Sequence, residues 1–267
     1  MTRIEESPPN VMGDARPLVE RLESADGFIV GFDYDGTLAP IREDPDAPTI
    51  PPRLERALQS LADRDGVQVA VVSGRQLDDL ADRVDVDGVV LAGNHGLELS
   101  RDGEPVLRDG VDRYLPSVRD AHSELQSSVA DVPGCHVEDK GVTITVHVRE
   151  TPADRVTDVR DRVLDTAAST PGVHVTEGKQ VFEVRPSVPH DKGTTMELLE
   201  GETPSDWLAL YLGDDTTDED AFAAIQPDGV GIHVGTGDTV AAYRLPEQGA
   251  VPEFVAWLAT QPWEASR

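Results

Sequence analysis

The sequence contains few lysines, few aromatic residues and a single cysteine. Among 267 residues, Lys140, Lys179 and Lys192 are the only lysines, Cys135 is the only cysteine, and aromatic residues make up 4%. One cysteine excludes an internal disulfide. Because aromatic side chains are scarce, the core must consist mainly of Val, Leu, Ile and Ala, for which a hydrophobic content of 38% is sufficient.

Long apolar runs are also missing. No uninterrupted apolar stretch is long enough to span a bilayer. The first ten residues, MTRIEESPPN, lack the apolar region of a secretory signal. We therefore expect a soluble, cytoplasmic protein.

Basic residues are far outnumbered by acidic ones. The 51 Asp and Glu against 23 Lys and Arg give a formal net charge of −28. A surface of this charge repels nucleic acids and anionic membranes, so we expect neither as a partner. Separately, we expect a monomer whose partner is a small molecule. The acid excess indicates a halophilic protein from a salt-rich cytoplasm. General solubility, or a GC-rich genome that favours Arg over Lys, are the alternative interpretations.

Apolar runs alternate with helical patterns toward both ends of the chain. The runs typical of strands buried on both faces are Phe28–Phe32, Val67–Val72, Val89–Leu91, Leu208–Leu212 and Val230–Val234. Helices are predicted over about 16–25 and 53–62, from Gln76, from Lys192 and over 252–260. This alternation predicts an α/β fold with a parallel sheet.

The pattern changes between residues 109 and 186. The segment VTITVHV at 142–148 alternates polar and apolar residues, as in a half-exposed antiparallel strand. Helices are predicted over 113–130 and from Pro152, the latter capped by Thr151, and a hairpin around 177–180. We therefore predict a core domain made of residues 1–108 and 187–267, with residues 1–13 as a disordered tail, and an inserted α+β cap domain at 109–186.

Polar clusters follow three of the predicted buried strands. Asp33 and Asp35 follow the strand at 28–32, Ser73 the strand at 67–72, and Asp214 the strand at 208–212. Ligands of open α/β sheets bind at the carboxyl ends of the strands, so we expect one site here. Neighbouring carboxylates need a cation, and an oxygen-only ligand set favours Mg²⁺.

The same residue types suit phosphoryl transfer. One carboxylate can attack phosphorus while the second handles the leaving-group proton. Ser73 and Lys192 are suited to hold the phosphoryl oxygens. Each motif is weak alone, since acidic pairs abound in this chain, but their order and their places at strand ends together favour function.

These motifs resemble those of a known superfamily. Asp33-Tyr34-Asp35-Gly36-Thr37, Ser73, Lys192 and Gly213–Asp218 resemble the four motifs of the haloacid dehalogenase superfamily of phosphotransferases. Within it, residues 28–258 are similar to the trehalose-6-phosphate phosphatase family. The most specific matches are Gly93–Glu98, Glu138–Gly141, Val146–Arg149, Gly178-Lys179 with Glu183–Pro186, and Gly213–Phe222.

The resemblance implies a fold and an activity. The fold would be a Rossmann-like parallel-sheet core, as in the haloacid dehalogenases, with an inserted α+β cap. The activity would be Mg²⁺-dependent hydrolysis of trehalose 6-phosphate to trehalose and phosphate through an aspartyl-phosphate, a step of trehalose biosynthesis.

The resemblance also implies residue roles. Asp33 would be the nucleophile and Asp35 the acid–base group. Mg²⁺ would be held by Asp33, the backbone carbonyl of Asp35 and Asp214, with Asp215 and Asp218 in support and Asp218 the better candidate for a water-mediated contact. Phosphate-binding residues would be Thr37, Ser73 and Lys192. Substrate-binding residues would be Asn94 and His95, near the seam between core and cap, and Glu138, Lys140, Arg149 and Glu183.

Three alternatives remain open. The chain could be a phosphatase for another sugar phosphate, such as sucrose 6-phosphate or mannosyl-3-phosphoglycerate, and only the cap residues separate these substrates. It could be a phosphomutase, which shares the aspartyl-phosphate step. It could be a non-catalytic sugar-phosphate-binding module, although Asp33, Asp35 and Lys192 are all present. His147, which alternates with Val146 and Val148, is interpreted as structural.

Overall fold

The chain folds into two compact units. The computed structural model describes residues 7–41 and 49–261. One unit, the core unit, contains the chain up to Val106 and from His190 onward, and the other, the inserted unit, is Leu107–Pro189. Within the described ranges, no helix has the length and apolar character needed to cross a membrane.

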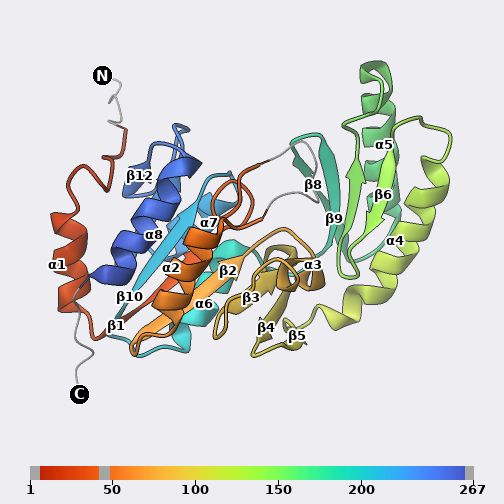
Figure 1. The fold of residues 1–267 in the computed structure, drawn as a ribbon. Coiled ribbons are helices and arrows are strands. Elements are labelled where there is room, and N and C mark those ends of the chain that lie inside the picture. Colours follow the sequence, from red (N-terminus) through yellow and green to blue (C-terminus); the bar gives the residue numbers. More distant parts are fainter. Residues whose placement is uncertain (1–6, 42–48, 262–267) are drawn as a thin grey trace, which may run out of the picture. The chain divides into compact units, whose positions relative to one another are not determined.

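The core unit is built on one sheet of eight strands (Figure 1). The six strands from β12 to β3 run parallel, and β4 is antiparallel to β3. In sheet order the strands are β12 (Tyr243–Leu245), β11 (Val230–Val234), β10 (Trp207–Gly213), β1 (Gly27–Phe32), β2 (Val67–Val72), β3 (Val90–Gly93), β4 (Glu98–Arg101) and β5 (Glu104–Leu107). The predicted parallel α/β core is therefore confirmed.

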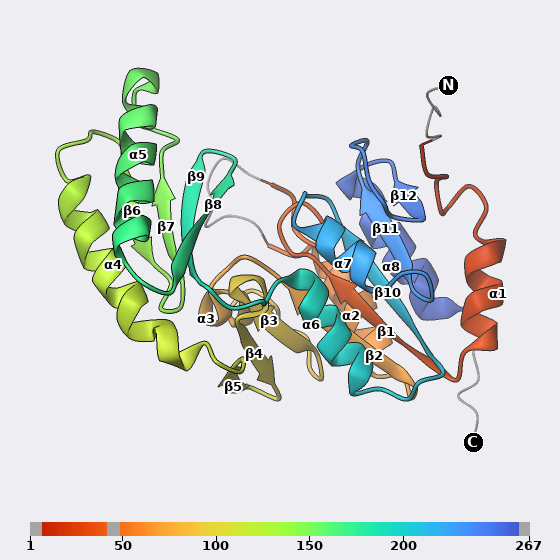
Figure 2. The ribbon, with the colours of Figure 1, turned by 180° about the vertical axis from the view of Figure 1, so that it is seen from behind.

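Helices cover both faces of this sheet (Figures 1 and 2). The helices are α1 (Arg16–Ser24), α2 (Pro52–Ala62), α3 (Leu77–Ala81), α6 (Lys192–Gly201), α7 (Asp218–Ala224) and α8 (Val251–Thr260). Every residue of β1 is buried. Its Phe28, Val30 and Phe32 pack in the apolar layer that includes side chains of α1, α2 and α8, whereas Ile29 packs in the layer with side chains of α6 and α7. Burial on both faces explains the continuous apolar run.

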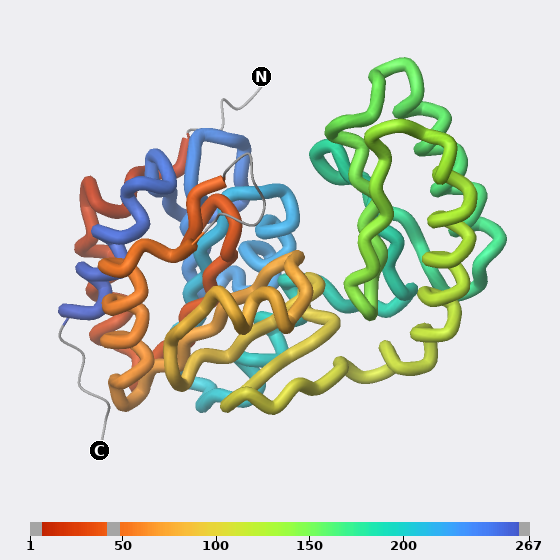
Figure 3. Tube along the Cα trace, turned by 45° about the vertical axis from the view of Figure 1, so that its right-hand side comes forward, coloured from red at the N-terminus to blue at the C-terminus, as the bar shows by residue number. Residues whose placement is uncertain are grey.

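The inserted unit is a four-stranded antiparallel sheet with two helices (Figure 3). The strands, in sheet order, are β6 (His136–Asp139), β7 (Ile144–His147), β9 (Val181–Pro186) and β8 (Val173–Gly178), and the helices are α4 (Leu115–Ser128) and α5 (Ala153–Ser169). Ile144, Val146, Phe182 and Val184 pack with the apolar residues of both helices. The residues that alternate with them lie on the opposite face of the sheet.

Two local expectations were wrong. Residues 1–6 of the expected tail lie outside the described residues, but the part that follows is ordered: Val11 is fully buried, and its N–H donates to the carbonyl of Arg244 in β12 at 3.0 Å. Thr151 does not cap α5, whose N-cap is Pro152 without a side-chain hydrogen bond. The Thr151 hydroxyl is instead buried with no hydrogen-bond partner among the described residues.

Candidate active site

The carboxyl ends of β1 and β10 bring acidic residues together in the core unit. Phe32 of β1 is paired with Leu212 of β10 and with Val71 of β2. The next residue along β1 is Asp33, whose N–H donates to the Leu212 carbonyl at 2.8 Å. β10 ends at Gly213, so Asp214 follows it directly. The parallel register thus places both aspartates at one edge of the sheet.

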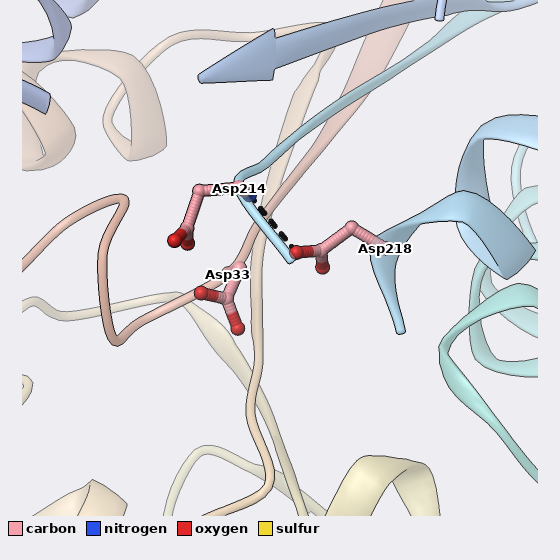
Figure 4. A group of neighbouring side chains, drawn as sticks. All are labelled: Asp33, Asp214 and Asp218. Atoms are coloured by element: carbon pink, nitrogen blue, oxygen red, sulfur yellow. Dashed lines mark hydrogen bonds between the residues drawn. The ribbon is translucent and has the colours of Figure 1, made fainter. Parts of the chain in front are cut away.

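Three carboxylates converge at this edge. Oxygen atoms of Asp33, Asp214 and Asp218 all lie within 4.8 Å of one another (Figure 4). Asp33 and Asp218 are buried, with residue exposures of 4% and 0%. Such a cluster of ionised groups is unfavourable unless positive charge is close by.

Lys192 supplies one positive charge. Its Nζ donates to Asp33 Oδ1 at 2.6 Å and to Asp218 Oδ1 at 2.7 Å, and its side chain is 3% exposed. Lys192 is the first residue of α6, and a capping box fixes this end of the helix: the Thr194 N–H donates to Asp191 Oδ1 and the Asp191 N–H donates to Thr194 Oγ1. The cap therefore determines where the lysine leaves the backbone.

Asp218 is fully engaged in hydrogen bonds. Its Oδ1 accepts from Lys192 and from the Tyr211 hydroxyl at 2.9 Å, and its Oδ2 accepts from the backbone N–H groups of Asp214 and Asp215 at 3.0 and 2.9 Å. Asp218 therefore shapes the loop that carries Asp214 and orients Lys192. With four bonds accepted, it has little capacity left to act as a direct metal ligand.

The environment raises the pKa of two of the carboxyls. Burial is the main cause of the raised pKa of Asp33, and the charge of Lys192 offsets it only in part. Burial, followed by the negative charge of Asp218, raises the pKa of Asp214 to about 6. Burial alone would lower the pKa of Lys192, but Asp218 and Asp33 outweigh it and raise that pKa. The lysine is therefore protonated, and the raised pKa values of Asp33 and Asp214 show that the cluster disfavours further negative charge.

The cluster fits a hard divalent cation. Asp33 Oδ2 is buried and, among the described residues, has no hydrogen-bond partner. A carboxylate oxygen of Asp214, whose pKa is raised, lies within 4.8 Å of an Asp33 oxygen. A cluster that offers carboxylate oxygens as ligands is the ligand chemistry that Mg²⁺ prefers.

Two glycines allow the loops to approach this closely. A Cβ at Gly36, which has φ +91°, would lie 2.2 Å from Asp214 Oδ2. A Cβ at Gly213 would lie 2.1 Å from Asp218 Cγ. Any side chain at either position would displace a carboxylate, so both positions require glycine.

The predicted phosphate-binding residues lie at the same sheet edge. Thr37 is fully buried and its Oγ1 donates to Asp214 Oδ1 at 3.3 Å. Ser73 directly follows β2, is 1% exposed, and its Oγ accepts from the Arg75 N–H at 3.2 Å. Lys192 contacts Asp33 directly.

The Asp35 side chain is paired with an arginine, and the carboxylate cluster consists of Asp33, Asp214 and Asp218 instead. Both Asp35 oxygens accept from Arg75, from Nε to Oδ2 and from Nη2 to Oδ1, each at 2.7 Å. Of Asp35, only the backbone carbonyl remains as the predicted metal ligand. Sequence reasoning gave Arg75 no role.

Asn94 and His95 lie in a tight turn after β3, in a 3-10 segment, Asn94–Gly96. Both have left-handed backbones, with φ of 49° and 58°. The N–H of Asn94 donates to the Arg75 carbonyl at 2.7 Å, and the N–H of His95 donates to the Ser73 carbonyl at 2.8 Å. The Asn94 side chain donates to Glu98 at 2.5 Å. The turn is therefore joined by its backbone to the Ser73–Arg75 loop.

The remaining predicted substrate residues belong to the inserted unit. Glu138 and Glu183 both pair with Thr145 in the register of β6, β7 and β9, so they lie on one face of the sheet. Lys140 Nζ lies 3.9 Å from Glu183 Oε1. Arg149 lies beyond the end of β7 and donates from Nε to Gln180 at 3.2 Å. The polar face thus gathers three of these four residues.

His147 contacts one of these residues. Its Nε2 lies 2.7 Å from Glu138 Oε2, and this hydrogen bond is the main cause of the lowered pKa of Glu138. The interpretation of His147 as structural missed this pairing. The alternation of residues 142–148 offered a signal, because it places His147 on the same face of β7 as Thr145.

Comparison with known proteins identifies a family that the chain resembles in sequence. The trehalose-phosphatase family matches residues 31–248. The trehalose-phosphate phosphatase of Mycobacterium tuberculosis is 40% identical over 262 residues, which cover 92% of this chain and 66% of that protein. The chain thus spans about two thirds of the length of this curated relative.

Solved structures share the fold. A trehalose-6-phosphate phosphatase related protein superposes with a TM-score of 0.77 at 27% identity, covering 86% of this chain and 96% of that one. The C-terminal domain of the trehalose-6-phosphate phosphatase of C. albicans has a TM-score of 0.77 at 26% identity, covering 97% of this chain and all of that one.

Proposed function

The chain belongs to the trehalose-phosphatase family, and from this premise we propose that it hydrolyses trehalose 6-phosphate to trehalose and phosphate with Mg²⁺ and an aspartyl-phosphate intermediate. The observation that carries the proposal is the group of Asp33, Asp214 and Lys192 at the carboxyl ends of β1 and β10, in which Asp33 and Lys192 are buried. The buried Asp33 carboxylate suits attack on phosphorus, and the lysine beside it suits an anionic phosphoryl group.

The reaction has two steps. In the first, a carboxylate oxygen of Asp33 attacks phosphorus, the bond between phosphorus and the sugar oxygen breaks, and Asp35 gives its proton to that oxygen. In the second, water attacks the phosphorus of the aspartyl-phosphate, Asp35 takes a proton from the water, and the bond from phosphorus to Asp33 breaks. Free phosphate leaves, and both aspartates return to their starting states.

The surrounding residues support these steps. Lys192 already donates to Asp33, so it is positioned to neutralise charge on a phosphoryl group transferred to that residue. Thr37 and Ser73 offer hydroxyl groups at the same edge of the sheet. Asp33, Asp214 and the backbone carbonyl of Asp35 would hold Mg²⁺, which would supply positive charge to offset that of the phosphoryl group.

Specificity for the sugar would come from the inserted unit. Glu138, Lys140 and Glu183 gather on the polar face of its sheet. Carboxylates accept hydrogen bonds from sugar hydroxyls and the ammonium group donates to them, so such a face suits a neutral, hydroxyl-rich ligand. These residues would separate trehalose 6-phosphate from other sugar phosphates.

The test is phosphate release from a panel of substrates with Mg²⁺, in dilute and in molar salt. The panel contains trehalose 6-phosphate, sucrose 6-phosphate, glucose 6-phosphate and mannosyl-3-phosphoglycerate. We expect a strong preference for trehalose 6-phosphate. Broad or shifted preference would leave a phosphatase but contradict the sugar specificity, and no release by folded protein in either salt would favour a binding module.

The nucleophile is tested by Asp33→Asn. Because the amide cannot form the aspartyl-phosphate, turnover should be abolished while the fold is kept, as measured by circular dichroism. Asp65→Asn removes the same charge from an exposed position of the same unit and should leave turnover unchanged. Near wild-type activity of Asp33→Asn would refute the assignment.

A further inference from the structure

The Arg75 guanidinium is held on three sides. Nε and Nη2 donate to the two oxygens of Asp35, each at 2.7 Å. Nη1 donates to Asp79 Oδ2 at 2.8 Å. The guanidinium carbon lies 5.3 Å from the centre of the Tyr34 ring. The Arg75 side chain is 15% exposed, and two charged contacts and one aromatic contact hold it in a single orientation.

The contacts on the far side of Arg75 are themselves fixed. Asp79 lies in α3 and also accepts from Arg83 Nε at 2.8 Å. The Arg83 side chain is 12% exposed, and Tyr34 is fully buried. The orientation of the guanidinium therefore depends on groups other than Asp35.

We propose that Arg75 is a positioning residue for Asp35 that fixes the direction in which this carboxylate exchanges its proton. The inference rests on the proposed function, in which Asp35 moves the proton. The Asp35 side chain is 37% exposed, so packing alone does not fix its two side-chain torsions. A bidentate contact with a rigid planar fork fixes both oxygens and with them the plane of the carboxylate.

The position of the Asp35 carboxylate matters most for a substrate whose leaving group needs a proton to depart. A sugar alkoxide is a poor leaving group, so departure of the sugar depends on proton donation by Asp35. p-Nitrophenolate leaves without a proton, so its departure does not. A misdirected Asp35 should therefore slow hydrolysis of the sugar ester and spare hydrolysis of the aryl ester.

The experiment measures kcat/KM with Mg²⁺ for trehalose 6-phosphate and p-nitrophenyl phosphate. The value of kcat/KM reflects only the steps up to formation of the aspartyl-phosphate, so the later attack by water does not affect it. The variants are Arg75→Gln and Arg75→Lys, each made in the native chain and in Asp35→Asn. Arg16→Gln is the matched control, because it breaks a two-point arginine–aspartate pair, Arg16 with Asp14, on an exposed part of the same unit.

We expect Arg75→Gln to lower kcat/KM for trehalose 6-phosphate by about 30- to 100-fold and for p-nitrophenyl phosphate by less than about threefold. Arg75→Lys keeps the charge but contacts one oxygen, so it should lose about tenfold on the sugar ester only. In Asp35→Asn, neither change should cause a further loss. Arg16→Gln should stay within about twofold on both esters.

The outcomes separate this inference from the function beneath it. Equal losses on both esters, or a full additional loss in Asp35→Asn, would show that Arg75 only holds loops together and would overturn the inference. If Arg75→Gln fails to fold, the same comparison is made with Arg75→Lys. A folded wild-type protein that cleaves neither ester would overturn the proposed function and this role with it.

Discussion

Lys192 is the position at which a single substitution should most affect the balance of charge in the core unit. Its Nζ donates to Asp33 at 2.6 Å and to Asp218 at 2.7 Å, and the three side chains are 3%, 6% and 0% exposed. Lys192→Met keeps most of the apolar stem and removes the charge and both hydrogen bonds. Two carboxylates then remain buried without their cation.

The expected loss follows from these two bonds. A hydrogen bond to a charged group contributes about 1.5–3 kcal/mol, and removing one member of a buried ion pair costs about 3–5 kcal/mol. We therefore expect Lys192→Met to lower the free energy of unfolding by about 3–5 kcal/mol near pH 8 without Mg²⁺. Lys179→Met, which removes an exposed hairpin lysine, should change it by less than about 0.5 kcal/mol.

The loss should depend on pH with a definite sign. The pKa of Asp33 is already raised by burial, and removing Lys192 raises it further. A carboxyl with a higher pKa in the folded than in the unfolded state contributes stability below its unfolded pKa, and this contribution is lost as pH rises through the folded pKa. The destabilisation of Lys192→Met relative to wild type should therefore be smaller near pH 5 than near pH 8.

The assay is urea denaturation of wild type, Lys192→Met and Lys179→Met at both pH values, in chelator and in Mg²⁺. Mg²⁺ should restore part of the stability of Lys192→Met, because the cation replaces some of the missing positive charge, and it should not restore turnover. A loss below about 1 kcal/mol at both pH values would refute the reasoning, since a cluster that tolerates the missing lysine has no excess charge to offset.

Two further predictions concern the loops and the surface. Gly213→Ala should destabilise the protein by about 1–3 kcal/mol and abolish turnover, because its Cβ would lie 2.1 Å from Asp218 Cγ. The control is Gly201→Ala, because a Cβ at Gly201 meets nothing within 4 Å. Equal melting temperatures for the two variants would contradict the argument. The net charge of −28 should make the unfolding free energy rise between about 0.05 M and about 1 M salt as the Debye length shortens; a value that does not change with salt would remove the evidence for halophilic adaptation.

The core of the fold could be predicted because its signals are local. The run Phe28–Phe32 is apolar on both faces and ends at Asp33, and the structure has β1 over Gly27–Phe32. β4 and β5 were missed because each has four residues and little apolar pattern. The ordering of residues 9–11 was missed because it comes from backbone pairing with Arg244, a contact that depends on a distant part of the chain.

In the candidate site, too, the features that follow from local sequence could be predicted and those that depend on distant contacts could not. Asp33 and Asp214 could be placed because each follows a recognisable buried strand. The direction of the Asp35 side chain could not be predicted, since it is determined by Arg75, 40 residues away in the sequence. The hydrogen bonds to Asp218 depend on how the loop after β10 folds back, which spacing alone does not specify.

The interrupted path of the chain through the core unit has a consequence for folding. β1 lies between β2, which follows soon after it, and β10, which begins at Trp207. The inserted unit, Leu107–Pro189, is continuous in sequence and is complete before β10 has been synthesised. Until then one edge of β1, with its wholly apolar faces, has no partner, and closing so long a loop is slow. The growing chain should therefore be most prone to aggregation in the interval before β10 emerges, and Asp33 should meet Asp214 only as one of the last events of folding.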